Sequence, residues 1–369
     1  MAAPVALFPP RPTLTFTTSG PLQDALDTAI DELKTALHKP VPFPIAIIDL
    51  EGGDTLECGS YKPDEIDYIA SSAKVAAMLA AYGLRDMARR LYVYLKMATG
   101  VAGMMAASGG SGAVKRAVNG MPTLFQALRT HMDPEVEDNS PALLHSVRKE
   151  HRVPQYENVF APPPKDGWSY PDFSGNFRAS MKAMIVPSDN SGAGRVVRGV
   201  GYGYLNGLLE HFGLLDLSTP TGIWLAGDYV GLYPYVRIQS VNDGGVAQAG
   251  SALAQAQMMA MIVNKACIDP ASCEEMRTLL AQASKGVDQP FVSRPDVKAD
   301  LRIPLSKITH AKLGYGPLKA GSNVASEMFR IEGIEKAGKA YAVAYQNVND
   351  NEPTNDVARV IRKTLKTYE

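Results

Sequence analysis

The sequence predicts an α+β protein in which one antiparallel sheet, flanked by terminal helices, carries an inserted all-helical subdomain. Three observations predict this arrangement. Strand-like runs occur towards both ends of the chain, helical runs fill its middle, and an amphipathic helix lies near each end. Because a sheet buries its apolar face against covering helices in one layered core, we expect the two ends to share a sheet and a cleft to lie between the sheet and the helical part.

The size and composition of the chain are those of a globular protein. It has 369 residues, of which 46% are hydrophobic and 20% charged, with 37 basic and 38 acidic residues. A net charge of -1 gives no general attraction to nucleic acid or to an anionic membrane. No apolar run is long enough to span a bilayer. We expect a small-molecule or peptide substrate as partner, in the cytoplasm, or in the periplasm or outside the cell if a leader has been removed.

The first elements form the start of an α/β subdomain, expected over residues 21–70 and 290–369. A proline-rich N-terminal extension covers residues 1–20. The apolar residues that follow recur three or four apart over residues 21–39, as in an amphipathic helix. Residues 42–61 then contain a β-branched run, a Gly-Gly turn and a second extended run, which is the pattern of a hairpin.

The middle of the chain, residues 71–289, is rich in Ala, Leu and Met and predicts the helical subdomain. The C-terminal part returns to extended segments. Three successive strands are expected over residues 307–316, 326–335 and 339–348, and a closing helix over residues 355–368.

A Ser-x-x-Lys pair, Ser71 and Lys74, lies where the second hairpin strand gives way to a strongly apolar helix. Side chains at i and i+3 share one helix face, with Cβ atoms about 5 to 6 Å apart. A partly desolvated lysine placed there can accept the proton of the serine hydroxyl. The backbone N–H of Ser71, at a helix N-terminus, could also stabilise an oxyanion. A second copy, Ser146 with Lys149, lies in a charged stretch typical of a solvated face.

Two further clusters carry possible chemistry. In Ser188-Asp189-Asn190, the serine could relay a proton to a leaving group, and Asn190 could bind a substrate amide or hold the lysine. The same triplet could simply be a turn with a helix N-cap. Ser174-Gly175-Asn176 fits the same Ser-x-Asn pattern.

The third cluster is Lys312-Leu313-Gly314-Tyr315 on an expected strand, where glycine allows close approach of another backbone. Lys319 and Lys336 are also followed by Gly two residues later, but they fall in a loop and a turn.

In this order and local context, the three clusters resemble the motifs of the serine β-lactamase and penicillin-binding-protein superfamily, with class A β-lactamases as the nearest pattern. The resemblance covers about residues 21–83 and 181–369. It implies acyl-enzyme chemistry without a metal or cofactor, and an oxyanion hole formed by the backbone amides of Ser71 and Tyr315. It also implies a role for each motif residue: Ser71 as nucleophile, Lys74 as base, Ser188 as proton donor, and Asn190, Lys312, Gly314 and Tyr315 as substrate-binding residues.

The chain departs from this pattern at two places. Leu313 replaces the Thr or Ser whose hydroxyl binds a substrate carboxylate in the superfamily, which favours an ester or amide with an apolar group. A Glu-x-x-Asn motif that activates the deacylating water in class A β-lactamases is missing from residues 217–239, where Asp228 is the nearest acid. We therefore expect slow deacylation.

Three alternatives stay open from the sequence. The protein is a serine hydrolase or acyltransferase acting on an amide, β-lactam or ester bond, or a catalytically inactive binding protein of the same fold, or the motifs are accidental. The aromatic residues of 229–236 either line the cleft or only hold a long loop in place. Cys267 and Cys273 could form a disulfide, although buried free thiols are favoured for these and for Cys58.

Overall fold

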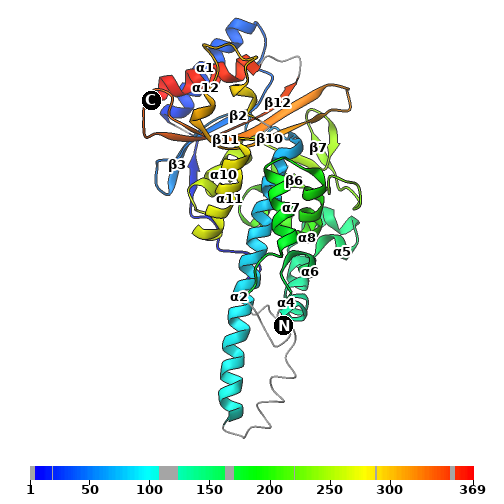
Figure 1. Ribbon diagram of the computed structural model, residues 1–369. Helices are drawn as coiled ribbons and strands as arrows, with labels where there is room; N and C mark the ends of the chain where they lie inside the picture. The colour runs from blue at the N-terminus through cyan, green and yellow to red at the C-terminus, as the bar shows by residue number, and fades with distance from the viewer. Residues whose placement is uncertain are drawn as a thin grey trace.

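The computed structural model describes residues 5–18, 20–107, 124–162, 170–219, 221–286, 289–349 and 354–369. A six-stranded sheet in the order β1-β3-β2-β12-β11-β10 lies in the upper part of the molecule as drawn in Figure 1. The strands are β1 (Thr15–Thr17), β2 (Ile45–Asp49), β3 (Thr55–Tyr61), β10 (Ile308–Pro317), β11 (Asn323–Glu332) and β12 (Ala340–Asn349). All neighbours are antiparallel except β1 and β3, which are parallel. The expected sheet built from both ends of the chain is confirmed.

Helices surround this sheet and form most of the middle of the chain. Their bounds are α1 (Pro21–Leu37), α2 (Lys74–Ala107), α4 (Leu124–Asp138), α5 (Lys149–Arg152), α6 (Tyr156–Val159), α7 (Gly175–Ile185), α8 (Asn190–Val200), α9 (Tyr202–His211), α10 (Ala252–Val263), α11 (Pro270–Ala283) and α12 (Thr354–Tyr368). Short 3₁₀ turns are η1 (Ala70–Ala73), η2 (Ala142–Ser146), η3 (Phe291–Ser293) and η4 (Leu305–Lys307).

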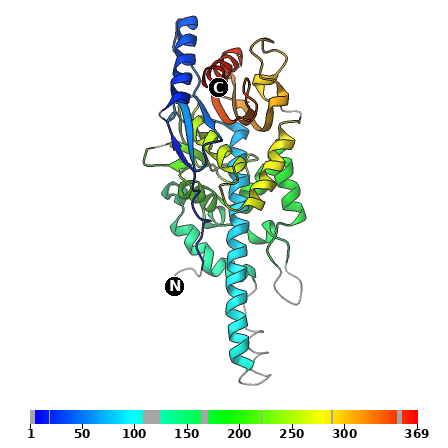
Figure 2. The same ribbon diagram turned by 90° about the vertical axis from the view of Figure 1, so that its left-hand side faces the viewer.

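The two faces of the sheet are covered by different helices. The terminal helices α1 and α12 pack against each other on one face, and α10 packs on the other (Figures 1 and 2). Successive side chains of a strand point to opposite faces, so Ile45 and Ile47 join the core under α1 and α12, whereas Ala46 and Ile48 join the core that includes α10. The α+β class predicted from the sequence is confirmed.

The long helix α2 runs through the helical part (Figure 2). Its first turns are buried on all sides from Val75 to Leu84, and at Gly83 an added Cβ would lie 2.9 Å from a Leu208 side-chain carbon. A helix that is apolar all round is expected to be enclosed by others, and α7, α8, α9 and α11 contact α2. This enclosure fixes the position of Lys74, the first residue of α2. Among the described residues, no helix combines the length and the apolarity needed to cross a membrane.

The expectation of an all-helical insertion is wrong in detail. A four-stranded sheet in the order β4-β9-β6-β5 and a separate hairpin of β7 and β8 lie largely within it. These strands are β4 (Asp67–Tyr68), β5 (Leu215–Asp216), β6 (Thr221–Leu225), β7 (Ile238–Ser240), β8 (Gly244–Val246) and β9 (Gln248–Gly250). Strands of two to five residues are too short to show a period-2 pattern. The division into subdomains at residues 70 and 290 stays a prediction.

Candidate active site

The proposed nucleophile, Ser71, lies in the 3₁₀ turn η1, immediately before α2. We name η1 the nucleophile turn, after this proposed role. Ser71 is partly exposed, whereas its neighbour Ser72 is buried. The Ser72 hydroxyl lies 2.8 Å from the carbonyl of Ile69 and 2.8 Å from Oε1 of Gln255, both possible acceptors. Of the two adjacent serines, Ser72 is thus engaged by the core and Ser71 is the one with access to solvent.

Two lysines far apart in the sequence meet at Ser188. Nζ of Lys312 donates to Oγ of Ser188 at 2.7 Å, and Nζ of Lys74 lies 2.6 Å from the carbonyl oxygen and 3.4 Å from Oγ of the same serine. Lys74 is 0% exposed and Lys312 is 2% exposed. Buried ammonium groups require hydrogen-bond acceptors, and Ser188 supplies one to each.

Asn190 completes this arrangement from the first turn of α8. Its Oδ1 accepts a hydrogen bond of 2.8 Å from Nζ of Lys74. Of the two roles open for Asn190 in the sequence, the structure shows the one of holding the lysine. Asp189 is the N-cap of α8, since its carboxylate accepts from the backbone N–H of Gly192. The triplet therefore combines an ordinary helix cap with contacts to both lysines.

The strand β10 lies directly against the nucleophile turn at Gly314. A Cβ added to Gly314 would lie 2.2 Å from the carbonyl oxygen of Ile69 and 2.7 Å from the backbone nitrogen of Ser72. Tyr315, the next residue, is 45% exposed. Because β10 is an edge strand, alternate backbone groups of β10 point away from the ladder with β11. The backbone of β10 thus lies beside η1, as an oxyanion hole at Ser71 and Tyr315 requires.

The side chain of Leu313 contributes no polar group to this surface, whereas its backbone carbonyl accepts a hydrogen bond of 2.9 Å from Nζ of Lys312. Leu313 is buried and pairs with Glu327 of β11. It lies between Lys312 and Gly314 along β10. Side chains of adjacent strand residues point to opposite faces. The structure therefore places Lys312 and Gly314 on one face of β10 and Leu313 on the other.

Three non-glycine residues with left-handed backbone conformations surround Lys74. The φ angles are 47° at Ala70, 60° at Ser188 and 61° at Tyr229. Such residues cost roughly 1 to 3 kcal/mol each and cluster at functional sites. Ser188 contacts Lys74 through its carbonyl, and the ring centroid of Tyr229 is 4.9 Å from Nζ of Lys74. In the sequence, Tyr229 stands out only as part of the run of aromatic residues 229–236.

Asp228, the nearest acid noted in the sequence, is occupied elsewhere. Its carboxylate accepts from Nη1 of Arg198 at 2.6 Å and from the backbone N–H groups of Gly231 and Leu232 at 2.8 and 3.2 Å. These bonds hold the loop after β6 in place and leave Asp228 poorly suited to activate a water.

The competing copies of each motif lie in other surroundings. Ser146 is exposed and donates to the carbonyl of Leu143, while Ser174 caps α7 by accepting from Phe177 N–H. Lys319 and Lys336 lie in exposed turns, where Lys319 contacts the carbonyl of Gly245. The structure brings together one copy of each motif, the one named for the site.

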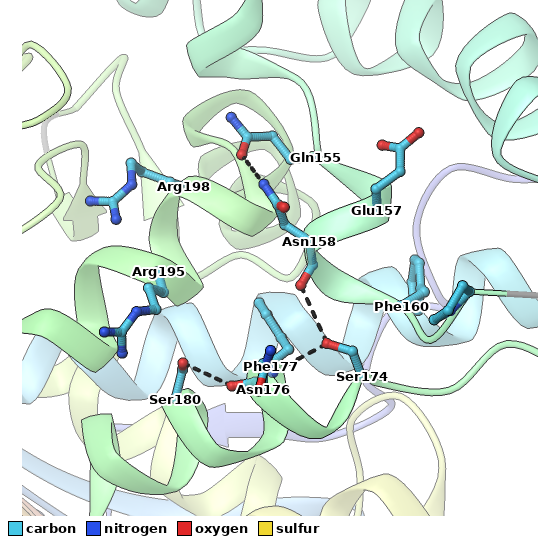
Figure 3. Close-up of a pocket in the computed structure, with 11 residues that line it drawn as sticks. Gln155, Glu157, Asn158, Phe160, Ser174, Asn176, Phe177, Ser180, Arg195 and Arg198 are labelled. Atoms are coloured by element: carbon cyan, nitrogen blue, oxygen red, sulfur yellow. Dashed lines mark hydrogen bonds between the residues drawn. The ribbon is translucent and has the colours of Figure 1, made fainter.

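A hollow of about 470 Å³ is lined by residues of α6, α7 and α8 and of the segments beside them (Figure 3). Its polar lining includes Ser174, Asn176, Ser180 and Arg195. Ser71, Lys74, Ser188 and Lys312 are not part of this lining, so the hollow is separate from the lysine cluster.

A buried polar chain lies behind the nucleophile turn. Gln255 accepts from Ser72 and donates to Oε1 of Gln346 at 3.0 Å, and Gln346 donates to Oδ2 of Asp67 at 2.9 Å. The other Asp67 oxygen, Oδ1, is buried with no hydrogen-bond partner in the described part of the chain. Burial raises the pKa of Asp67 to about 6, against the smaller lowering effect of the bond from Gln346.

This raised pKa predicts a pH dependence of stability that Asp67→Asn removes. The unfolded carboxyl has a pKa of about 3.9. Between about pH 4 and 6 the folded state holds a proton that the unfolded state has lost, so stability falls as pH rises. Above pH 6 the buried charge persists, and Asp67→Asn should be more stable than the parent by about 1 to 2 kcal/mol. Urea unfolding at pH 4.5 and pH 8 measures this difference.

The matched control is Asp64→Asn, because Asp64 is exposed in the same segment. It should leave the pH profile of stability unchanged. A loss of stability for Asp67→Asn at pH 8 would contradict the assignment of a buried, poorly compensated charge to Asp67.

Cys267 and Cys273 are buried free thiols whose Sγ atoms lie 3.4 Å apart, and Cys58 is a buried free thiol as well. Over the described ranges, no group of three or more His, Cys, Asp or Glu side chains is arranged to hold a metal ion.

Comparison with known proteins gives matches among solved structures alone. No protein-family model matches the sequence, and no curated protein does. Similar solved structures include the TLA-1 extended-spectrum β-lactamase, with a TM-score of 0.48 and 14% identity over 94% of this chain and 97% of that one. A β-lactamase from Chitinophaga pinensis has a TM-score of 0.48 and 13% identity, over 93% and 97% of the two chains. A class A β-lactamase from Bacteroides cellulosilyticus has a TM-score of 0.48 and 11% identity, over 95% and 98%.

With TM-scores below 0.5, these overlays are a likeness in the arrangement of elements and say nothing about chemistry. The order of motifs within the fold is independent of them. The hairpin β2–β3 leads to the Ser-x-x-Lys turn, the Ser-Asp-Asn loop joins α7 to α8, and Lys-x-Gly lies on the edge strand β10. This is the order of motifs that the sequence resemblance predicts, and the described residues place it on an α+β fold.

Proposed function

We propose that the protein is a serine hydrolase or acyltransferase that forms an acyl-enzyme on Ser71. The observation that carries this proposal is the convergence of Lys74 and Lys312 on Ser188, with Lys74 one helical turn after a partly exposed serine. Two buried amines near one hydroxyl are an arrangement suited to proton transfer, because neighbouring cations favour the neutral form of one of them.

In the proposed reaction, the Ser71 oxygen attacks an acyl carbonyl and its proton passes to Lys74. The oxyanion lies at the backbone N–H groups of Ser71 and Tyr315. As the bond to the leaving nitrogen or oxygen breaks, Ser188 gives that atom a proton and regains one from Lys74. The Ser188 oxygen accepts from Lys312, so its own hydrogen is available for donation. Water or another acceptor then takes the acyl group from Ser71.

The proposed substrate is an amide, β-lactam or ester. Leu313 offers no hydroxyl to a substrate carboxylate, and Asp228 is bound by Arg198. The missing hydroxyl at position 313 supports an apolar acyl group. The engaged carboxylate of Asp228 supports slow release of that group from the enzyme.

Covalent labelling tests this function directly. The protein is incubated with a fluorophosphonate, a panel of β-lactams and activated esters, and its intact mass is measured with time. We expect an adduct that peptide mapping places on the segment containing Ser71 and that persists for the β-lactams. Reversible ligand binding without any adduct would instead support a binding protein of the same fold.

Ser188→Gly separates the chemistry of Ser188 from its structural role. Glycine adopts a positive φ freely, so relief of strain should offset its entropic cost and leave stability within about 1 kcal/mol of the parent. Loss of the hydroxyl should slow acylation by a β-lactam about 100-fold or more. A p-nitrophenyl ester should be affected far less, because its phenolate leaves without a proton. The two acylation rates are measured by stopped-flow absorbance.

Ser174→Gly is the control for this variant, since Ser174 belongs to the competing Ser-x-Asn triplet, where its hydroxyl caps α7 and donates to the carbonyl of Asn158 at 3.5 Å. It should change neither acylation rate. Equal losses with both leaving groups in Ser188→Gly would argue against proton donation by Ser188.

A further inference from the structure

Tyr229 connects the nucleophile turn to the lysine. Its hydroxyl donates to the carbonyl oxygen of Ala70 at 3.2 Å, one residue before Ser71. Its ring lies 4.9 Å from Nζ of Lys74, measured to the ring centroid. One side chain thus contacts the two segments whose separation decides whether Ser71 can give its proton to Lys74.

Both ends of the hydrogen bond from Tyr229 lie at strained backbone positions. Ala70 has a φ of 47° and Tyr229 a φ of 61°. A strained non-glycine residue persists only where its surroundings hold it. For Tyr229, these surroundings include the hydrogen bonds of the preceding residue. Asp228 is held by Arg198 and by two backbone N–H groups of the same loop.

The chemistry of the phenol suits positioning and not proton transfer. Burial raises the pKa of Tyr229 well above its ordinary value, so the side chain stays a neutral hydrogen-bond donor over the whole working range. The face of its ring attracts an ammonium group within about 6 Å. Tyr229 therefore fixes where Nζ of Lys74 lies and how η1 is oriented, without exchanging a proton.

We propose that Tyr229 is a positioning residue for the Ser71–Lys74 pair, acting through the Ala70 carbonyl and the Lys74 ammonium. This inference rests on the proposed function for its effect on rate, while the geometry of Lys74 and Tyr229 can be tested without any reaction. Two substitutions separate the contact of the hydroxyl with Ala70 from the contact of the ring with Lys74. Tyr229→Phe removes the hydroxyl and keeps the ring, and Tyr229→Leu removes both.

The rate of fluorophosphonate labelling is measured from pH 6 to pH 10 for each variant. Loss of one hydrogen bond in Tyr229→Phe should slow labelling roughly 3- to 10-fold. Misplacement of the lysine in Tyr229→Leu should slow it about 100-fold and move the midpoint of the pH–rate profile. Tyr233→Phe is the control on the same loop, because the Tyr233 hydroxyl accepts from Gln155 instead. It should leave both the rate and the midpoint unchanged.

Proton NMR provides a readout that needs no acylation. A ring at this distance should shift the ε-methylene protons of Lys74 upfield, with the assignment made from the signal lost in Lys74→Arg. The shift should persist in Tyr229→Phe and disappear in Tyr229→Leu. If Tyr229→Leu does not fold, the wild-type shift and the Tyr229→Phe rate decide the question.

The outcomes separate the two proposals. An unlabelled wild-type protein with the upfield shift overturns the proposed function and keeps the placement of Lys74 by Tyr229. A labelled wild-type protein whose Tyr229→Leu variant reacts at the same rate and pH midpoint overturns the positioning role. Absence of the upfield shift in the wild type overturns it as well.

Discussion

Replacing Ser71 by alanine should abolish covalent labelling of the protein by a fluorophosphonate or a β-lactam. The proposal gives the Ser71 oxygen the bond to the acyl or phosphonyl group, and two hydroxyls near it, those of Ser72 and Ser188, are engaged in other ways. Ser72 is buried and bonded to Gln255, and Ser188 is proposed to carry a proton. We therefore expect complete loss of the adduct in the intact mass, with the melting temperature of the protein little changed.

The matched control is Ser146→Ala, which removes the serine of the second Ser-x-x-Lys copy. Ser146 is exposed and bonded to its own turn at Leu143, so this variant should be labelled at the parental rate. An adduct that survives Ser71→Ala and is lost in Ser146→Ala would place the reactive serine on the solvated helix face and end the present proposal. Reversible binding of a β-lactam that survives Ser71→Ala, without an adduct in the parent, would favour the binding protein.

The sequence predicted the sheet well because its long strands carry strong patterns. In β12, bulky Tyr341 and Val343 alternate with small Ala342 and Ala344, and such alternation is a direct signal of a strand with two different faces. The terminal helices showed equally clear apolar stripes. The small strands β4 to β9 were missed because two to five residues give no measurable period, and their pairing depends on contacts across the fold. The strand β1 was missed for the same reason and pairs with β3 in parallel.

The site was predicted through short motifs whose residues are close together in the sequence. The contacts between one motif and another could not be predicted in this way. Ser71 to Lys74 is one helical turn, so their common face follows from the sequence. That Lys74 and Lys312 share Ser188 depends on how α7 and α8 pack against α2 and on where the sheet holds Lys312 of β10. Tyr229 approaches Lys74 from a loop 155 positions later in the numbering of the chain. No pattern of neighbouring residues encodes such a contact, and only the fold reveals it.

The close approach of β10 to the nucleophile turn predicts a second large effect, at Gly314. A methyl group at this position would lie 2.2 Å from the carbonyl oxygen of Ile69 and 2.7 Å from the backbone nitrogen of Ser72. Both neighbours are backbone atoms, so no side chain can rotate away, and either β10 or η1 must move. Overpacking of this kind costs about 3 kcal/mol, which Gly314→Ala should lose from the free energy of unfolding.

Gly314→Ala should also slow labelling of Ser71 by about 100-fold, because a shift of 1 Å at a reacting group has an effect of that size. The movement separates the backbone of β10 from η1 and draws Lys312 away from Ser188, so acylation should fall even at temperatures where the variant is folded. Gly175→Ala is the control: nothing lies within 4 Å of its added Cβ, at the first residue of α7, and both stability and labelling should stay near the parental values. If Gly314→Ala kept the parental melting temperature and labelling rate, β10 could not lie against the nucleophile turn, and the oxyanion hole proposed between Ser71 and Tyr315 would have no structural basis.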